Sequence, residues 1–205
     1  LVIILDRFGG QIGPLIAGLG VAGLAVALAL QDTLSNFFAG VHILGDKPIR
    51  IGDFIKLETG QEGFVREIGW RSIRIETTSK DFIIVPNSKV AQSIITDYSS
   101  PIKDTNIVVD IGVSYDSDVD LVEKILIDSA KTVSKINDSI NKDFEPIVFF
   151  WSFGDSALNF KLIYQINDYT KHVPTSSQIR KEILKQFRKH KIEIPYPIRT
   201  IIQKK

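Results

Sequence analysis

The chain has 205 residues, with 25 Lys and Arg against 24 Asp and Glu, and 44% of its residues are hydrophobic. This length allows one large or two small domains. The apolar content excludes intrinsic disorder, and the net charge of +1 argues against a chain built mainly to coat nucleic acid, which needs a strong basic excess. The chain contains no cysteine, so disulfide scaffolds, thiolate zinc sites and cysteine nucleophiles are excluded.

Residues 12–30 form an uncharged, apolar segment near the N-terminus. As a helix it would reach about 28 Å, close to the hydrocarbon core of a bilayer at about 30 Å. Glycine and alanine recur in it at three- and four-residue spacing, which membrane helices use to bring their backbones together. The alternative is a buried helix of a soluble core, but such small side chains fill a core poorly. We therefore predict a membrane-spanning helix over about 11–31, with the lipid bilayer as partner.

A second, amphipathic helix is predicted over about 32–45. The polar residues 31–33 interrupt the apolar run, and Asp32 is placed to cap the new helix. Apolar side chains then recur at helical spacing on an aromatic-rich face, namely Leu34, Phe37, Phe38, Val41 and Leu44. Such a helix tends to lie in the membrane interface. The cations that follow favour a cytoplasmic location for residues from about 46 onward; they are Lys47, Arg50 and Lys56.

The rest of the chain has the pattern of two soluble domains. Short alternating runs over 53–57, 63–68, 71–75 and 82–85 predict a small β-barrel within residues 49–101. Residues 102–195 predict a strand over 106–113, a helix from about 117, strands over 147–151 and 158–166, and a helix from near 175. With a last strand, this order is that of a ferredoxin-like α+β unit. Two capping boxes are predicted, Ser117 with Asp120 and Thr175 with Gln178.

Motifs that would support catalysis or metal binding are incomplete. Asp116, Asp118 and Asp120 have the rhythm of an EF-hand loop, but Leu121 replaces the glycine at its sixth position and Ile127 the glutamate at its twelfth. We interpret the three carboxylates as residues of a helix N-terminus. No two of the three histidines share a ligand spacing; they are His42, His172 and His190. A basic run over 180–191 is typical of a solvated helix face. We predict no enzyme, no metal site and no cofactor.

Five motifs spread along the chain resemble the small-conductance mechanosensitive channel family (MscS-like). They are residues 29–40 (ALQDTLSNFFAG), 48–53 (PIRIGD), 85–87 (VPN), 113–118 (VSYDSD) and 195–197 (PYP). The resemblance implies a homo-heptameric channel that membrane tension opens, releasing ions and small osmolytes during hypo-osmotic shock. It implies a membrane segment over 1–48 and further membrane helices upstream, with residues 1–5 as the end of the preceding one.

The resemblance also implies the architecture of the soluble part. An Sm-like β domain would be followed by the α+β domain, together forming a cytoplasmic cage. In this reading residues 196–205 carry the C-terminal strand of an intersubunit barrel, over Ile198–Gln203, instead of the fourth ferredoxin-like strand.

By the same resemblance, the pore lies along the first helix. Leu24 and Leu28 are four residues apart and share one face, and they match the positions of two leucine rings that narrow the family's pore; the alternative is that they face lipid or neighbouring helices. The resemblance assigns helix packing to Gly20, Gly23 and Ala27 against Ala17, Val21 and Ala25 of the next subunit. It assigns the kink and the pore mouth to Gln31, Asp32 and Gly40.

Two alternative functions stay open at this point. The soluble part could be an RNA-binding module, because Sm-like barrels elsewhere bind RNA; the near-zero net charge and the membrane segment count against it. The protein could also be a ligand-modulated channel of the same fold, although residues 50–205 contain no motif for a nucleotide or a metal.

Overall fold

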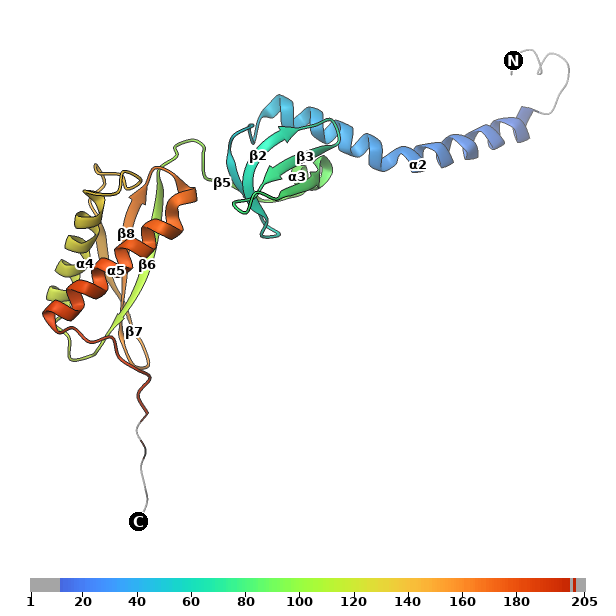
Figure 1. The fold of residues 1–205 in the computed structure, drawn as a ribbon. Coiled ribbons are helices and arrows are strands. Elements are labelled where there is room, and N and C mark those ends of the chain that lie inside the picture. Colours follow the sequence, from blue (N-terminus) through green and yellow to red (C-terminus); the bar gives the residue numbers. More distant parts are fainter. Residues whose placement is uncertain (1–11, 200, 202–205) are drawn as a thin grey trace. The chain divides into compact units, whose positions relative to one another are not determined.

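The computed structural model describes residues 12–199 and residue 201, which divide into two compact units after Asp97 (Figure 1). The first unit contains a long helix and a small β domain, and the second contains an α+β domain. The expectation that residues 1–5 end a preceding helix lies outside the described residues. So do residues 200, 202 and 203 of the strand predicted over Ile198–Gln203.

Helix α2 runs without interruption over Ile12–Asp46, 35 residues, so the break predicted at residues 31–33 is wrong. No glycine or proline stands between Gly23 and Gly40, and Asp, Thr or Ser inside a helix costs less than about 0.7 kcal/mol each. Asp32 is therefore an internal residue of the helix, not its N-cap. Its backbone carbonyl accepts a hydrogen bond from Asn36 Nδ2 at 2.8 Å.

The β domain is an antiparallel five-stranded sheet in the order β4-β3-β2-β1-β5. Its elements are β1 (Phe54–Leu57), β2 (Glu62–Ile68), β3 (Ser72–Glu76), β4 (Phe82–Pro86), helix α3 (Asn87–Gln92) and β5 (Ile95–Asp97). Ile43 of α2 and Ile49 join the strands in one buried core. The first four strands agree with the predicted runs to within a few residues, whereas α3 and β5 were not predicted because they are too short to show a period.

The α+β domain has the predicted order of strand, helix, strand, strand, helix. Its elements are β6 (Thr105–Val113), α4 (Val119–Ser134), β7 (Ile147–Phe153), β8 (Leu158–Ile166), a 3₁₀ turn η1 (Tyr169–Lys171) and α5 (His172–His190). The strand order is β6-β8-β7, and α4 and α5 lie side by side against one face of the sheet (Figure 1). Every second residue of β8, from Leu158 to Ile166, is buried in the core.

Residues 191–199 and 201 contain no strand, so the described part of this domain lacks the fourth strand of a complete ferredoxin-like unit. Both predicted capping boxes are wrong. The N-cap of α4 is Asp118, whose carboxylate accepts from the backbone N–H groups of Asp120 and Leu121. Helix α5 begins at His172, three residues before Thr175, and its N-cap has no side-chain hydrogen bond.

Thr175 and Gln178 have a different role from capping. Their side-chain oxygens accept hydrogen bonds from Asn137 Nδ2, at 3.3 Å and 2.8 Å. This contact ties the start of α5 to the chain that follows α4.

Candidate functional site

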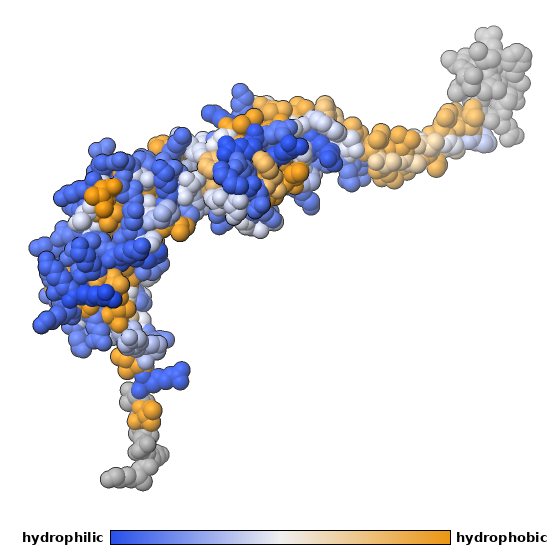
Figure 2. Space-filling view, in the orientation of Figure 1, coloured by the Kyte–Doolittle hydropathy of each residue, from blue (hydrophilic) through white to orange (hydrophobic). Residues whose placement is uncertain are grey.

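The first two thirds of α2 are exposed to the surroundings in this chain. Residues 13–35 are all exposed, and the helix is apolar enough to cross a membrane, with a mean hydropathy of 2.1 over its most apolar stretch. Figure 2 shows hydrophobic surface gathered along it. A 35-residue helix measures about 52 Å, so it is longer than the hydrocarbon core of a bilayer, which is about 30 Å thick.

All the residues predicted to line or pack the pore lie on this exposed part of α2. Leu24 and Leu28 are 61% and 62% exposed. A Cβ atom added at Gly20 or Gly23 would meet nothing within 4 Å. These side chains are therefore available to lipid or to other copies of the chain.

The helical period arranges the predicted site residues in order around α2. At about 100° per residue, Gly20, Gly23 and Ala27 fall on one flank of the face that carries Leu24 and Leu28. Val21 and Ala25 fall on the opposite flank, Ala17 and Gln31 lie within or beside the leucine face, and Asp32 borders it. Val26 points away from it. Glycine and alanine thus border one side of the leucine face, and a valine and an alanine border the other.

The last third of α2 packs on the β domain through polar residues that sequence reasoning did not single out. Asn36 Oδ1 accepts a hydrogen bond from the backbone N–H of Ser88 in α3 at 3.0 Å. Asn87 is fully buried, and its Nδ2 donates to the carbonyls of Gly69 at 3.0 Å and Asn36 at 3.4 Å. The motif over 85–87 was the signal in the sequence that could have pointed to Asn87, although we assigned this motif no role from the sequence.

Gly40 permits this close approach. A Cβ atom at Gly40 would lie 2.5 Å from Asn87 Nδ2 and 3.0 Å from the backbone oxygen of Trp70. Ala39 and Ile43 beside it are buried. The structure therefore gives Gly40 a packing role at the junction, while the helix continues through it without the predicted kink.

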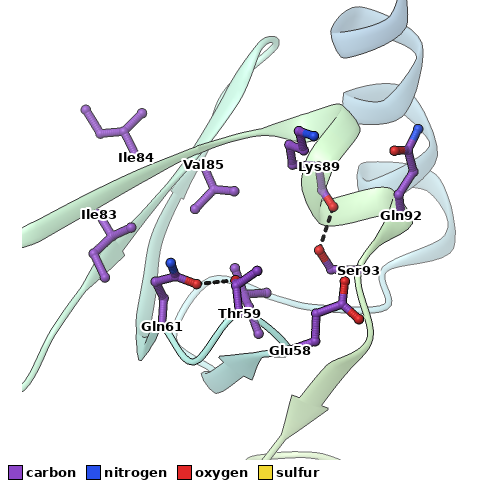
Figure 3. Close-up of a pocket in the computed structure, with 10 residues that line it drawn as sticks. Glu58, Thr59, Gln61, Ile83, Ile84, Val85, Lys89, Gln92 and Ser93 are labelled. Atoms are coloured by element: carbon purple, nitrogen blue, oxygen red, sulfur yellow. Dashed lines mark hydrogen bonds between the residues drawn. The ribbon is translucent and has the colours of Figure 1, made fainter.

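The β domain also has a hollow between the β1–β2 turn, strand β4 and helix α3. Figure 3 shows Glu58, Thr59 and Gln61 from the β1–β2 turn facing Ile83 and Val85 of β4, with residues of α3 nearby. Its polar groups bond locally: Thr59 Oγ1 donates to Gln61 Oε1, and Ser93 Oγ donates to the Lys89 carbonyl at 2.7 Å. This arrangement contains no catalytic constellation.

Glu76 and His172 are held by contacts within the fold. Hydrogen bonds from Lys80 and then Arg66 lower the pKa of Glu76 on β3. His172 Nδ1 lies 2.7 Å from the Tyr169 carbonyl, and its ring stacks on Tyr169. Among the residues that the structure describes, no group of three His, Asp or Glu side chains could hold a metal ion.

Sequence models of mechanosensitive ion channels match successive parts of the chain. The model for transmembrane helices 2/3 matches residues 1–31, the model for the beta-domain residues 32–100, and the model for the MscS C-terminal part residues 107–194.

Relatives of the chain, both named channels and uncharacterised proteins, match it over nearly its whole length. The chain is 38% identical to the large-conductance mechanosensitive channel MscMJLR and 34% identical to the small-conductance channel MscMJ of Methanocaldococcus jannaschii; the alignments cover 100% and 98% of this chain and 57% of each relative. It is 35% identical to an uncharacterised MscS family protein of Buchnera aphidicola, over 96% of this chain and 68% of that protein. The chain thus spans little more than half the length of the two archaeal channels.

A solved structure has the same fold. Helicobacter pylori MscS in its closed state superposes with a TM-score of 0.86 at 29% identity, covering 100% of this chain and 78% of that one. A long exposed apolar helix followed by a β domain and an α+β domain is thus the architecture that this chain shares with a membrane channel subunit. The chain belongs to the MscS family of mechanosensitive ion channels.

Proposed function

We propose that the protein is an ion channel that membrane tension opens, with its pore lined by α2 from several copies of the chain. The observation that carries this proposal is the exposed leucine face of α2. Leu24 and Leu28 are 61% and 62% exposed in this chain, and glycine and alanine residues border them on one flank. In a ring of such helices, the flank with Gly20, Gly23 and Ala27 would meet the flank with Val21 and Ala25 of the next copy.

The closed pore in this proposal is held shut by dewetting. Two rings of leucine side chains make a narrow apolar constriction, which water leaves and which an ion cannot enter without its hydration shell. Tension favours the state of larger in-plane area, so it shifts a two-state equilibrium toward tilted, separated helices. Small residues let neighbouring backbones approach and slide. Seven copies, and the release of ions and small osmolytes during hypo-osmotic shock, complete the proposal by analogy with the family.

The continuous helix has two parts in this account. Residues up to about 31 cross the membrane and line the pore, and residues 32–45, with exposed Phe37, Phe38 and Leu44, lie at the interface. Asp32 stands at the pore mouth. The junction of Asn36 and Gly40 with α3 couples the pore helix to the β domain. We further propose that the β domain is Sm-like and that both soluble domains are cytoplasmic.

Patch-clamp recording of the full-length protein in liposomes tests the proposal. Stepwise suction should open discrete conductances at a reproducible tension, and protein-free liposomes should stay silent. If purified, correctly assembled protein gives no pressure-gated current, the proposed function is wrong.

A further inference from the structure

Two of the motifs found in the sequence meet at one end of the α+β domain. They are residues 113–118, which connect β6 to α4, and residues 195–197, which follow α5. The β7–β8 turn lies between them and is closed by a hydrogen bond from the Gly154 N–H to the Ala157 carbonyl at 2.8 Å. The proposed gate on α2 involves none of these residues.

The chain turns back after α5 and reaches the end of β6. Lys191 has the left-handed conformation (φ 57°) that ends the helix, and the Ser114 N–H donates to the Glu193 carbonyl at 2.9 Å. Strand β6 is an outer strand of its sheet, so a further strand could continue from this point along its edge. The residues that follow, 193–198, form no strand; we call them the C-terminal segment.

Two prolines prevent the C-terminal segment from pairing with β6. In an antiparallel pair, every second residue of a strand directs its N–H toward the same neighbour. With Glu193 opposite Ser114, the next residues that would face β6 are Pro195 and Pro197. Neither has an N–H to donate, so within the described residues the segment leaves the edge of β6.

A second hydrogen bond takes the segment to the β7–β8 turn instead. The Ile198 N–H donates to Ser156 Oγ in this turn at 3.1 Å. Tyr115 holds the turn, because its hydroxyl donates to the Gly154 carbonyl at 2.7 Å and its ring stacks on Phe153. The C-terminal segment is therefore attached at both of its ends.

We propose that Ser156 and Tyr115 are positioning residues that fix the direction in which the C-terminal segment leaves the α+β domain. Ser156 orients the segment directly, and Tyr115 acts through the turn. Tyr196, Ile198 and Ile201 are 84%, 68% and 83% exposed, and exposed apolar side chains of this size mark surfaces that bind protein. The fixed direction would bring these side chains against those of other copies. This last step rests on the proposed function, whereas the attachment does not.

Hydrogen exchange of the full-length protein measures the attachment. Because two of the residues 194–199 are prolines without an amide, a peptide that covers this range reports few amides, and that of Ile198 is one of them. Ser156→Ala and Tyr115→Phe should each speed its exchange about fivefold, which corresponds to about 1 kcal/mol. Exchange in β8 should stay as in the wild type, which shows that the domain remains folded.

Two variants serve as controls for the loss of a hydroxyl. Ser156→Thr keeps an oxygen that can accept from the Ile198 N–H. Ser117→Ala removes a hydroxyl of the β6–α4 connection that takes no part in these hydrogen bonds. Both should match the wild type in exchange at Ile198.

The prolines are tested by giving the segment back its N–H groups. Pro195→Val/Pro197→Val would let it continue along β6 as a further strand. The amides of Asp110 and Gly112 face this edge in the same way as that of Ser114, so their exchange should slow in the double variant. Unchanged exchange at both amides would show that the prolines do not keep the segment from β6.

Contact between copies is measured separately, by disulfide cross-linking in liposomes. The chain has no cysteine, so Ile201→Cys adds a thiol at an exposed position in full-length protein from which any other cysteine has been removed. Oxidation should link copies to one another. Ser156→Ala or Tyr115→Phe should slow the cross-linking about twofold or more, because a segment that has lost one hydrogen bond samples other directions.

Each result decides one part of the proposal. Unchanged exchange at Ile198 in Ser156→Ala would overturn the attachment, and an effect of Ser156→Ala without one of Tyr115→Phe would remove Tyr115 from it. Faster exchange with unchanged cross-linking would overturn its role in contact between copies. Faster exchange in a protein that shows no cross-linking even without these substitutions would sustain the attachment and reject the assembly of several copies on which the proposed channel depends.

Discussion

Asn36 on α2 and Ser88 on α3 are joined by a hydrogen bond across 52 residues of sequence, from the Ser88 backbone N–H to Asn36 Oδ1 at 3.0 Å. The same asparagine donates to the Asp32 carbonyl within its own helix. One side chain therefore links the helix that we place in the membrane to the domain that follows it.

Replacing Asn36 tests this link. Asn36→Ala leaves the half-buried N–H of Ser88 unpaired, and we expect a loss of about 1–3 kcal/mol in the free energy of unfolding together with a shifted tension threshold. Asn36→Asp keeps the acceptor oxygen and should lie closer to wild type in both measurements. Thermal unfolding and patch-clamp recording of the two variants check this, and equal behaviour of the alanine and aspartate variants would contradict it.

Gly40 is expected to tolerate no larger side chain. In Gly40→Ala the new methyl group meets Asn87 Nδ2 and the Trp70 carbonyl, so α2 and α3 must separate, at a cost of about 1–3 kcal/mol. Gly45→Ala is the matched control, because its Cβ meets nothing within 4 Å and alanine favours a helix by about 1 kcal/mol. Thermal unfolding should therefore move in opposite directions for the two variants. A stabilising Gly40→Ala would show that the junction is looser than described.

The leucine face should control the closed state. Leu24→Ser or Leu28→Ser puts a hydroxyl that binds water into every subunit's part of the constriction. We expect a lower tension threshold, current without suction, and slower growth of cells that express the variant. Val26→Ser makes a similar change on the opposite side of the helix and should be milder. If Val26→Ser leaks while Leu24→Ser and Leu28→Ser gate like the wild-type channel, another face of α2 lines the pore.

Asp32 should influence which ions pass. It is exposed on α2, four residues beyond Leu28, and a ring of carboxylates there would attract cations. Asp32→Asn should therefore shift the reversal potential in asymmetric salt toward anion preference. Because Asp32 is inside the helix and caps nothing, the substitution should alter helix stability by only a few tenths of a kcal/mol. An unchanged reversal potential would remove Asp32 from the conduction path.

The β domain should lose stability in acid through Glu76. Lys80 and Arg66 lower the pKa of this carboxyl in the folded protein. The ionised carboxylate therefore adds to the free energy of unfolding at any pH above its pKa in the unfolded chain. This stabilisation disappears as the pH falls through the lower pKa of the folded state. Glu76→Gln should destabilise the protein near neutral pH and match wild type below the folded pKa. Glu67→Gln, at an ion pair with Arg74 in which both side chains are 56% exposed, should have a smaller effect. Thermal unfolding across this pH range measures the difference.

Some of this structure follows from local sequence alone. Nineteen uncharged residues predict a membrane helix whatever surrounds them, and the strict alternation over 158–166 predicts a strand with one buried face, which β8 has. These patterns are readable because a period of 3.6 or 2 residues repeats along one element. The leucine face and its two flanks follow from the same helical period.

The junction and the element ends were decided by tertiary structure. Spacing along the chain does not reveal that Asn36 meets Ser88, or that Gly40 must make room for Asn87, because these contacts join residues about fifty positions apart. Likewise Thr175 and Gln178 match a capping box in sequence, yet their oxygens accept from Asn137, and the helix begins earlier. Polar side chains can satisfy their hydrogen bonds locally or at a distance, and only the packed fold determines which partner lies within reach.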